Sequence, residues 1–228
     1  MAAPLVEREF MNVAEAVQTR RSIRSFSKES VALETIKRVL ETARWTPSGC
    51  NFQPWEATVL TGEPLEALQQ VLLQSKFDEP LEYDFSAPGQ LEKYQGRLRR
   101  VGSAMYGAMG IEREDDETRA NFAKSNCLSF GAPILLLCHF PKLMKEPQWS
   151  DVGMWLQTIM LLLRSEGLDS CPQEYMGLYG RTIKHHLGLS DDIMLFCCLA
   201  IGKRDATSPV NEFERERVPL GDQVTFLG

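Results

Sequence analysis

Residues 132–140 of this chain, APILLLCHF, form a continuous apolar run of strand length, and residues 193–202, IMLFCCLAIG, form a second one. A strand with one face in water alternates apolar and polar residues, whereas these runs leave almost no polar position. Both are therefore predicted to be strands buried on both faces. This constrains the fold more than any other feature, because both sides of such strands have to be covered.

A strongly apolar helix is predicted over residues 149–168, WSDVGMWLQTIMLLLRSEGL. Apolar side chains occur nearly all round it, which is typical of a helix at the centre of a molecule or in an interface. Gly167 suits the C-terminal cap of this helix.

Other helices and strands alternate along the chain. The spacing of apolar residues predicts helices over 10–18, 30–46, 63–75 and 181–189, and over most of 91–126 with a break at Gly110. A strand is predicted over 55–62, and 169–176 is predicted to be a short strand that leads into a loop. Residues 76–90 are predicted to be a loop, and QVTFL at 223–227 in the tail could add an extra strand. Because strands and helices interleave, the fold class is α/β or α+β.

Charge and composition exclude several classes of partner. The net charge is −6 and the isoelectric point is about 5.2, which argues against general nucleic-acid binding. No apolar run is long enough to span a bilayer, and the N-terminal MAAPLVEREF lacks the basic-then-apolar order of a signal peptide. We expect a cytoplasmic protein with no membrane partner, whose six cysteines are reduced.

Four segments carry residues suited to ligand binding. TRRSIR at 19–24 offers guanidinium and hydroxyl donors for a phosphate, and ERER at 214–217 places Arg215 and Arg217 on one side of an extended segment. TPSGCNFQPW at 46–55 presents uncharged amides that suit a heteroaromatic ring, and CPQEYMG at 171–177 follows a predicted strand. Each segment alone is also typical of an ordinary exposed turn or loop.

Several well-known motifs are missing from the sequence. There is no G-x-G-x-x-G after a strand, no P-loop and no G-x-S-x-G nucleophile elbow. The adjacent His185 and His186 point in different directions on a helix, so no metal site is expected. Cys50 has no histidine near it in sequence and is expected to be a bystander thiol.

Taken in order, the segments RRSIRSF, PSGCNFQPW, GLDSCPQEY and PVNEFERERVP resemble the FMN-dependent nitroreductase family, and the resemblance covers nearly the whole chain. It implies an α+β fold: a three-layer sandwich with a central, mostly antiparallel sheet flanked by helices, in an intertwined homodimer that holds two FMN molecules in its interface. It also implies one domain over residues 1–228. Within it, 76–126 would be a helical insert near the active site, and 205–228 a tail that reaches across the dimer.

The resemblance assigns roles by position. Arg20, Arg21, Ser22 and Arg24 would hold the FMN phosphate, the ribityl chain and the ring edge, with Arg215 and Arg217 joining them at the phosphate. Pro47, Ser48, Gly49, Asn51 and Gln53 would reach the flavin from the other subunit. Pro172, Gln173, Glu174 and Tyr175 would line one face of the ring, with the backbone N–H near the catalytic position Glu174 approaching flavin N5. Asp151 would be a further polar contact to the cofactor.

The implied activity is oxidation of NAD(P)H and reduction of a nitroaromatic, quinone or similar acceptor, by ping-pong hydride transfer through tightly bound FMN. This agrees with the missing dinucleotide fingerprint and acid–base dyad, because a flavin supplies the redox chemistry itself. A flavin reductase or a reductive dehalogenase on the same fold, and a flavin-binding module without turnover, remain as alternatives. The sequence departs from the family at Cys50 and at CPQEY, where other members often place glycine near Tyr175.

Overall fold

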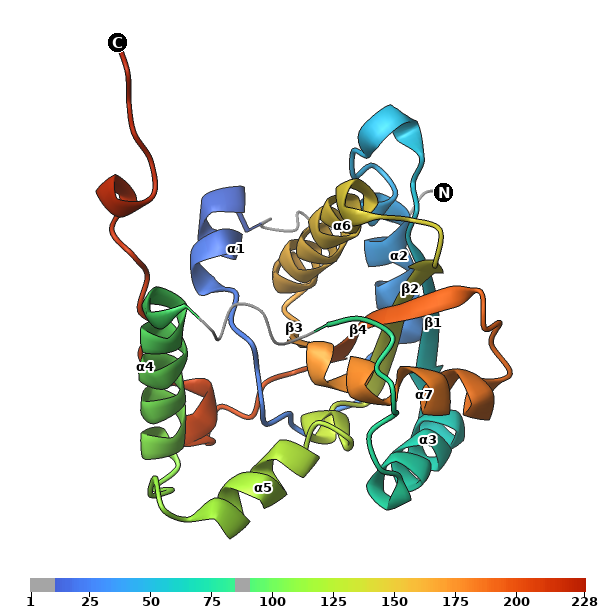
Figure 1. Ribbon diagram of the computed structural model, residues 1–228, viewed down its shortest axis with the longest axis horizontal. Helices are drawn as coiled ribbons and strands as arrows, with labels where there is room; N and C mark the ends of the chain where they lie inside the picture. The colour runs from blue at the N-terminus through green and yellow to red at the C-terminus, as the bar shows by residue number, and fades with distance from the viewer. Residues whose placement is uncertain (1–10, 85–90) are drawn as a thin grey trace, which may run out of the picture.

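The computed structural model describes residues 11–84 and 91–228, and it is built around a four-stranded sheet (Figure 1). The strands are β1 (Glu56–Thr61), β2 (Ile134–Pro141), β3 (Asp169–Gln173) and β4 (Ile193–Gly202). They are ordered β1-β2-β4-β3, and each neighbouring pair is antiparallel. The two apolar runs of the sequence are therefore the two inner strands, and the α+β class is confirmed.

Helices cover both faces of the sheet. Helices α2 (Leu33–Ala43) and α6 (Glu146–Ser165) pack on one face, and α3 (Gly62–Gln74) and α7 (Gly180–Leu187) pack on the other. Along β2, Ile134 and Leu136 join the first layer while Leu135 and Leu137 join the second. This alternation between two cores explains why the strand has no polar side, and it gives the predicted three layers.

Helix α6 is central to its layer, as its apolar sequence predicts. Val152, Leu156, Ile159 and Leu163 are buried against α2 and the sheet. The ring of Trp155 stacks on Trp55 with a centroid distance of 5.9 Å. The helix ends where Gly167 adopts a φ of +72°, a left-handed conformation that glycine accepts without strain.

The remaining helices lie outside these layers. They are α1 (Val13–Thr19), α4 (Glu92–Ala108) and α5 (Asp116–Lys124). Helices α4 and α5 form the helical part of the predicted insert, with the chain breaking near Gly110 as expected. No residue of α4 is buried, and its apolar side chains Leu98 and Val101 are exposed. The helix lies beside the C-terminal segment (Figure 1).

The described part of the 76–90 loop is pinned by two carboxylates. Asp78 accepts from the backbone N–H of Arg181 at 2.7 Å and from the hydroxyl of Thr182 at 2.7 Å, which caps the start of α7. Glu82 is buried between Lys184, at 2.6 Å, and Lys142, at 2.9 Å. Residues 85–90 of this loop and Phe10 of the first predicted helix lie outside the described residues.

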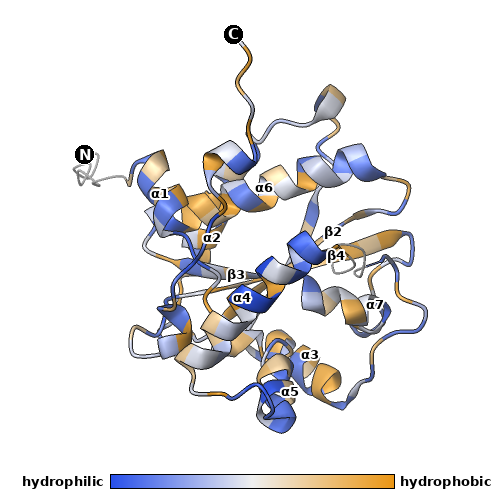
Figure 2. Cartoon of the chain, turned by 60° about the vertical axis from the view of Figure 1, so that its left-hand side comes forward, coloured by the Kyte–Doolittle hydropathy of each residue, from blue (hydrophilic) through white to orange (hydrophobic). Residues whose placement is uncertain are grey.

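The extra strand suggested at 223–227 does not form. The chain makes one 3-10 turn at Leu220–Asp222 and then runs away from the rest of the molecule in both views (Figures 1 and 2). A single extended segment has no partner for its backbone hydrogen bonds, so its alternating pattern is not enough to make a strand. Among the described residues, no helix has the length and hydropathy that crossing a bilayer requires.

Candidate functional site

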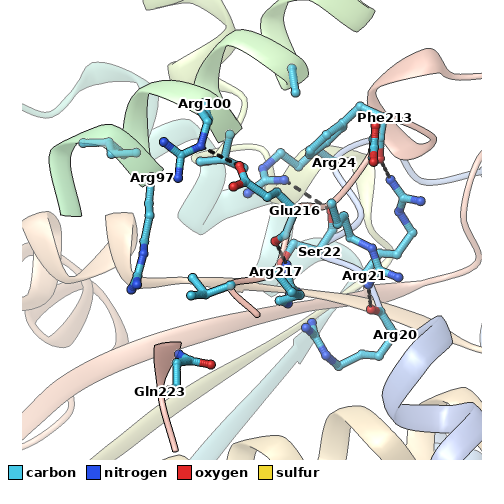
Figure 3. Close-up of a pocket in the computed structure, with 16 residues that line it drawn as sticks. Arg20, Arg21, Ser22, Arg24, Arg97, Arg100, Phe213, Glu216, Arg217 and Gln223 are labelled. Carbon is cyan, nitrogen blue, oxygen red and sulfur yellow. Dashed lines mark hydrogen bonds and ion pairs between the residues drawn. The ribbon is translucent and has the colours of Figure 1, made fainter. Parts of the chain in front are cut away.

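Two segments nearly two hundred residues apart, 20–24 and 213–218, meet α4 around a pocket of about 770 Å³ (Figure 3). It is called the arginine pocket below. Its lining residues are Arg20, Arg21, Ser22, Arg24, Arg97, Leu98, Arg100, Val101, Ala104, Phe213, Glu214, Arg215, Glu216, Arg217, Val218 and Gln223. Seven arginines and two glutamates thus face one cavity. The structure brings together all six of the residues that the sequence predicts for a phosphate site.

The first arginine segment is positioned by the edge of the sheet. Ser22 pairs with Ser170 of β3 as an isolated parallel bridge, and the N–H of Ile23 donates to the carbonyl of Ser170 at 3.0 Å. Ile23 and Phe26 are buried, whereas Ser22 and Arg24 between and beside them are only partly buried. An extended backbone turns alternate side chains to opposite sides, so burying Ile23 leaves Ser22 and Arg24 at the pocket.

Asn211 ties the tail to this segment. Its side-chain oxygen accepts from the N–H of Arg24 at 2.9 Å, and its amide nitrogen donates to the carbonyls of Ser25 and Asp205 at 2.8 and 3.0 Å. The side chain is buried and uses three hydrogen bonds, so it fixes where ERER begins. Sequence reasoning missed Asn211, although it directly precedes the charged run.

Arginine side chains of each segment donate hydrogen bonds to backbone carbonyls of the other segment. The guanidinium of Arg215 donates to the carbonyl of Arg20 and, at 2.7 Å, to that of Gln18. The guanidinium of Arg21 donates to the carbonyl of Phe213 and lies 5.6 Å from the centre of its ring. These contacts come from side chains on both segments, so each segment orients the other.

The electrostatics of the pocket favour an anion. Burial lowers the pKa of Arg20, and the neighbouring charge of Arg217 lowers it further. Burial also lowers the pKa of Arg215, with added repulsion from Arg21, Arg217 and Arg20. Partly desolvated like charges this close destabilise one another unless an anion lies among them. Guanidinium forks are well matched to phosphate oxygens.

The predicted loop at 46–55 lies elsewhere. Its backbone is strained at Cys50, Asn51 and Gln53, whose φ values are +50°, +59° and +49°. The buried carboxylate of Asp151 on α6 accepts from the N–H of Gly49 at 3.2 and 3.3 Å and so holds the loop in place. The lining of the arginine pocket includes none of the residues predicted from this loop and α6, which are Pro47, Ser48, Gly49, Asn51, Gln53 and Asp151. A single chain therefore does not bring this group to the arginines.

The third predicted group is joined to the arginines by β3. Near the start of this strand, burial raises the pKa of the Cys171 thiol to about 11, and the charges of Arg24 and Arg20 act against that rise. Pro172, Gln173, Glu174 and Tyr175 follow at its end, where Glu174 is exposed. The strand therefore places these residues directly after the stretch that borders the arginines.

The side chain of Gln173 points into the protein. Its amide nitrogen donates to the backbone carbonyl and the side-chain oxygen of Asn126, at 2.9 and 3.1 Å. Its carbonyl oxygen is buried and accepts no hydrogen bond within the described part of the chain. Tyr175 packs edge-on against Phe77 at 5.8 Å and beside Tyr179 at 6.1 Å, so residues near the insert shape this end of β3.

Helix α4 is the second contribution that the sequence did not predict at the residue level. Arg97, Leu98, Arg100, Val101 and Ala104 form one wall of the arginine pocket. Arg100 pairs with Glu216 of the tail at 2.6 Å. The sequence feature that could have indicated this wall is the basic run GRLRR inside the predicted insert. A helical pattern does not show that this run lies against a tail more than one hundred residues later.

Comparison with known proteins places the chain among flavoenzyme relatives. Residues 17–203 match the model of the Nitroreductase family. A 4-nitrobenzoate reductase of Pseudomonas putida is 34% identical over 213 residues, which are 93% of this chain and 94% of the relative.

Two solved structures are also similar. One is the FMN and NADPH-dependent nitroreductase NfnB from Sphigopyxis sp. strain HMH, with 41% identity, a TM-score of 0.92 and coverage of 96% of this chain and 100% of the other. The second is the FMN-dependent nitroreductase NfnB from Mycobacterium smegmatis in complex with NADPH, with 26% identity, a TM-score of 0.88 and coverage of 95% and 100%. The sequence match over most of the chain and these two structural matches agree: the chain belongs to the Nitroreductase family.

Proposed function

We propose that this protein is an FMN-dependent NAD(P)H oxidoreductase that reduces nitroaromatic compounds. The observation that carries the proposal is the arginine pocket, which Arg20, Ser22 and Arg215 from distant segments line together. Relatives described as 4-nitrobenzoate reductase and chloronitrobenzene nitroreductase, each covering more than nine tenths of the chain, support the reaction class.

The residues present fit FMN. Its phosphate would neutralise guanidinium groups whose pKa values are lowered by burial and by each other. The donors are of two kinds, forked guanidinium groups and the hydroxyl of Ser22, which together suit a phosphate ester. When bound, FMN supplies the centre that accepts and gives up hydride.

The chain's own residues position the ring and tune its surroundings. Arg20, Arg21, Arg215 and Arg217, which line the pocket, would hold the phosphate end, and Arg24 would supply positive charge nearer the ring edge. Pro172, Gln173, Glu174 and Tyr175 would line one face, because β3 runs from the arginines towards them. The backbone N–H near Glu174 would face the reacting edge. No side chain acts as an acid–base dyad in this scheme.

We infer that two copies of the chain complete the site. The loop containing Gly49, Asn51 and Gln53 is exposed and remote from the arginine pocket of its own chain, although its backbone is strained and held by Asp151. A second copy would bring this loop to the ring. Exposed Phe226 and Leu227 on the outstretched tail are suited to contact that copy. Each copy would be a single domain, with the insert beside the site.

Purified protein tests the proposal directly. We expect a yellow protein that releases FMN on denaturation, bleaches anaerobically with NADPH or NADH, and regains colour when a nitroaromatic compound is added. A panel with quinones, free flavins and halogenated phenols would separate nitroreduction from the alternative reactions. A colourless protein that takes up no added FMN would contradict the cofactor, and a flavin that neither dinucleotide reduces would contradict the reaction.

A further inference from the structure

The arginine pocket carries more positive charge than one FMN phosphate needs. Seven arginines face it against two glutamates. A phosphate monoester contributes only about −1.5 to −2 charges at neutral pH. The arginines also come from different directions. In Figure 3, Arg20, Arg21 and Phe213 lie on one side, Glu216 and Arg217 lie in the middle, and Arg97 and Arg100 project from α4 on the opposite side.

The two arginines of α4 that line the pocket, Arg97 and Arg100, differ in their partners. Arg100 is paired with Glu216 at 2.6 Å, which links α4 to the tail and occupies that carboxylate. Arg97 lies 5.3 Å from the ring centre of Tyr94, and no carboxylate among the described residues forms an ion pair with it. Its side chain extends into the pocket towards Gln223 (Figure 3). A partly buried guanidinium with unused forked donors is suited to an anion from outside the chain.

We propose that Arg97 binds a second phosphate, the 2′-phosphate of NADPH, and thereby favours NADPH over NADH. This rests on the proposed function, since it concerns the dinucleotide that reduces the flavin. A dianion close to the FMN phosphate would be repelled by it, and a cation on the far wall offsets that repulsion. Because the group is partly exposed, the benefit falls as ionic strength rises.

The other anion to consider is a carboxylate on an aromatic acceptor. Such an acceptor has to stack on the flavin ring, which the proposed function places at the end of β3, beside Pro172 to Tyr175. None of those four residues lines the arginine pocket, whereas Arg97 does. The position of Arg97 at the phosphate end therefore favours the dinucleotide.

The test compares Arg97→Gln with Arg99→Gln. Arg99 is exposed on the same helix and does not line the pocket. Its variant therefore removes one positive charge from α4 outside the pocket. In the FMN-loaded enzyme, Arg97→Gln should raise the KM for NADPH about tenfold or more and leave the KM for NADH nearly unchanged. Arg99→Gln should preserve the parent's ratio of the two values.

Calorimetry gives a readout independent of turnover. Adenosine 2′,5′-bisphosphate should bind the parent and Arg99→Gln more tightly than adenosine 5′-monophosphate does, and Arg97→Gln should lose that advantage. FMN content should be the same in all three proteins.

Three outcomes would overturn the inference: an NADPH-to-NADH ratio that Arg97→Gln leaves unchanged, an equal effect of Arg99→Gln, or a change only in the KM of a carboxylated acceptor. If the parent's flavin is reduced by neither dinucleotide, the proposed function itself fails, so the two failures are distinguishable.

Discussion

At the scale of single residues, the arginine pocket shows what sequence order can and cannot reveal. Arg20 and Arg215 were grouped by the order of four segments, and the structure explains the grouping through Asn211 and the guanidinium-to-carbonyl contacts. Arg97 was not grouped with them. It belongs to a helix whose own pattern offers only an exposed apolar stripe, and nothing local in the sequence indicates that the tail lies against it.

The four arginines proposed to hold the FMN phosphate, Arg20, Arg21, Arg215 and Arg217, are called the phosphate clamp below. Removing one of them should weaken FMN binding. We expect Arg20→Ala and Arg215→Ala each to raise the dissociation constant of FMN by roughly ten- to a hundredfold, because a charge-assisted bond to phosphate is lost. The fluorescence of released FMN measures this constant. Arg44→Ala is the control, since Arg44 is exposed at the C-terminal end of α2 and pairs with the neighbouring Glu41. Parent-like FMN binding in both pocket variants would show that the phosphate lies elsewhere.

At the scale of elements, periodicity predicted the core well and the connections poorly. The predicted elements at 132–140, 149–168 and 193–202 correspond to β2, α6 and β4. They were predictable because the apolar residues of each pattern lie on surfaces that other elements bury. The 76–90 loop has no period, so its anchoring through Asp78 and Glu82 was not predictable. Both carboxylates are ordinary polar residues in sequence, and only their distant partners give them a role.

Glu82 should be among the most important polar residues for stability. Lys184 is completely buried, and its ammonium group is paired with Glu82 and the carbonyl of Ile193. Glu82→Ala should lower the free energy of unfolding by about 3–5 kcal/mol, because a buried charge then loses its counterion. Urea unfolding measures this loss. Glu66→Ala removes an exposed carboxylate from α3 and should change the stability little; similar losses in both variants would contradict the account.

His139 on β2 makes the stability of the folded protein depend on pH. Burial lowers the pKa of its imidazole, which the nearby Glu56 carboxylate only partly opposes. The folded state therefore disfavours the proton, and the unfolded chain binds more protons as the pH falls through about 6.5. The contribution of His139 to the free energy of unfolding is therefore fully present above pH 6.5. It is lost as the pH falls from 6.5 towards the lower pKa that His139 has in the folded state.

The corresponding experiment is urea unfolding of the parent, His139→Gln and His185→Gln at pH 7.5 and 5.5. The drop in the free energy of unfolding on acidification should be smaller in His139→Gln, where glutamine keeps a polar group beside Thr58. His185 is exposed on α7, so His185→Gln should behave like the parent. An equal drop in all three proteins would mean that His139 does not cause the dependence.

At the scale of the whole molecule, one chain holds apart two groups of residues that are predicted to form one site. The arginine pocket and the end of β3 are joined by a strand, whereas the loop at 46–55 is held apart from them on α6. The resemblance to the Nitroreductase family implies that such a site is divided between two subunits, which stays a prediction for this chain. The sequence could indicate it only through that likeness, because no pattern within a chain records which of its surfaces a second copy covers.

The end of the tail is where the proposed homodimer can be tested without changing the phosphate clamp. Residues 224–228 leave the molecule after the last pocket residue, Gln223, and expose Val224, Phe226 and Leu227. If a second copy buries Phe226 and Leu227, each contributes about 1.5–3 kcal/mol to association. Deleting 224–228 should therefore raise the dimer dissociation constant at least about tenfold, as measured by sedimentation equilibrium.

The deletion should also weaken FMN binding at low protein concentration, because the loop supplied by the second copy is lost with the dimer. Raising the protein concentration should restore it, which a damaged phosphate clamp would not allow. Leu143→Ala, which removes an exposed apolar side chain after β2, is the matched control and should leave association unchanged. A deletion variant that associates as tightly as the parent would show that the tail does not reach across a dimer.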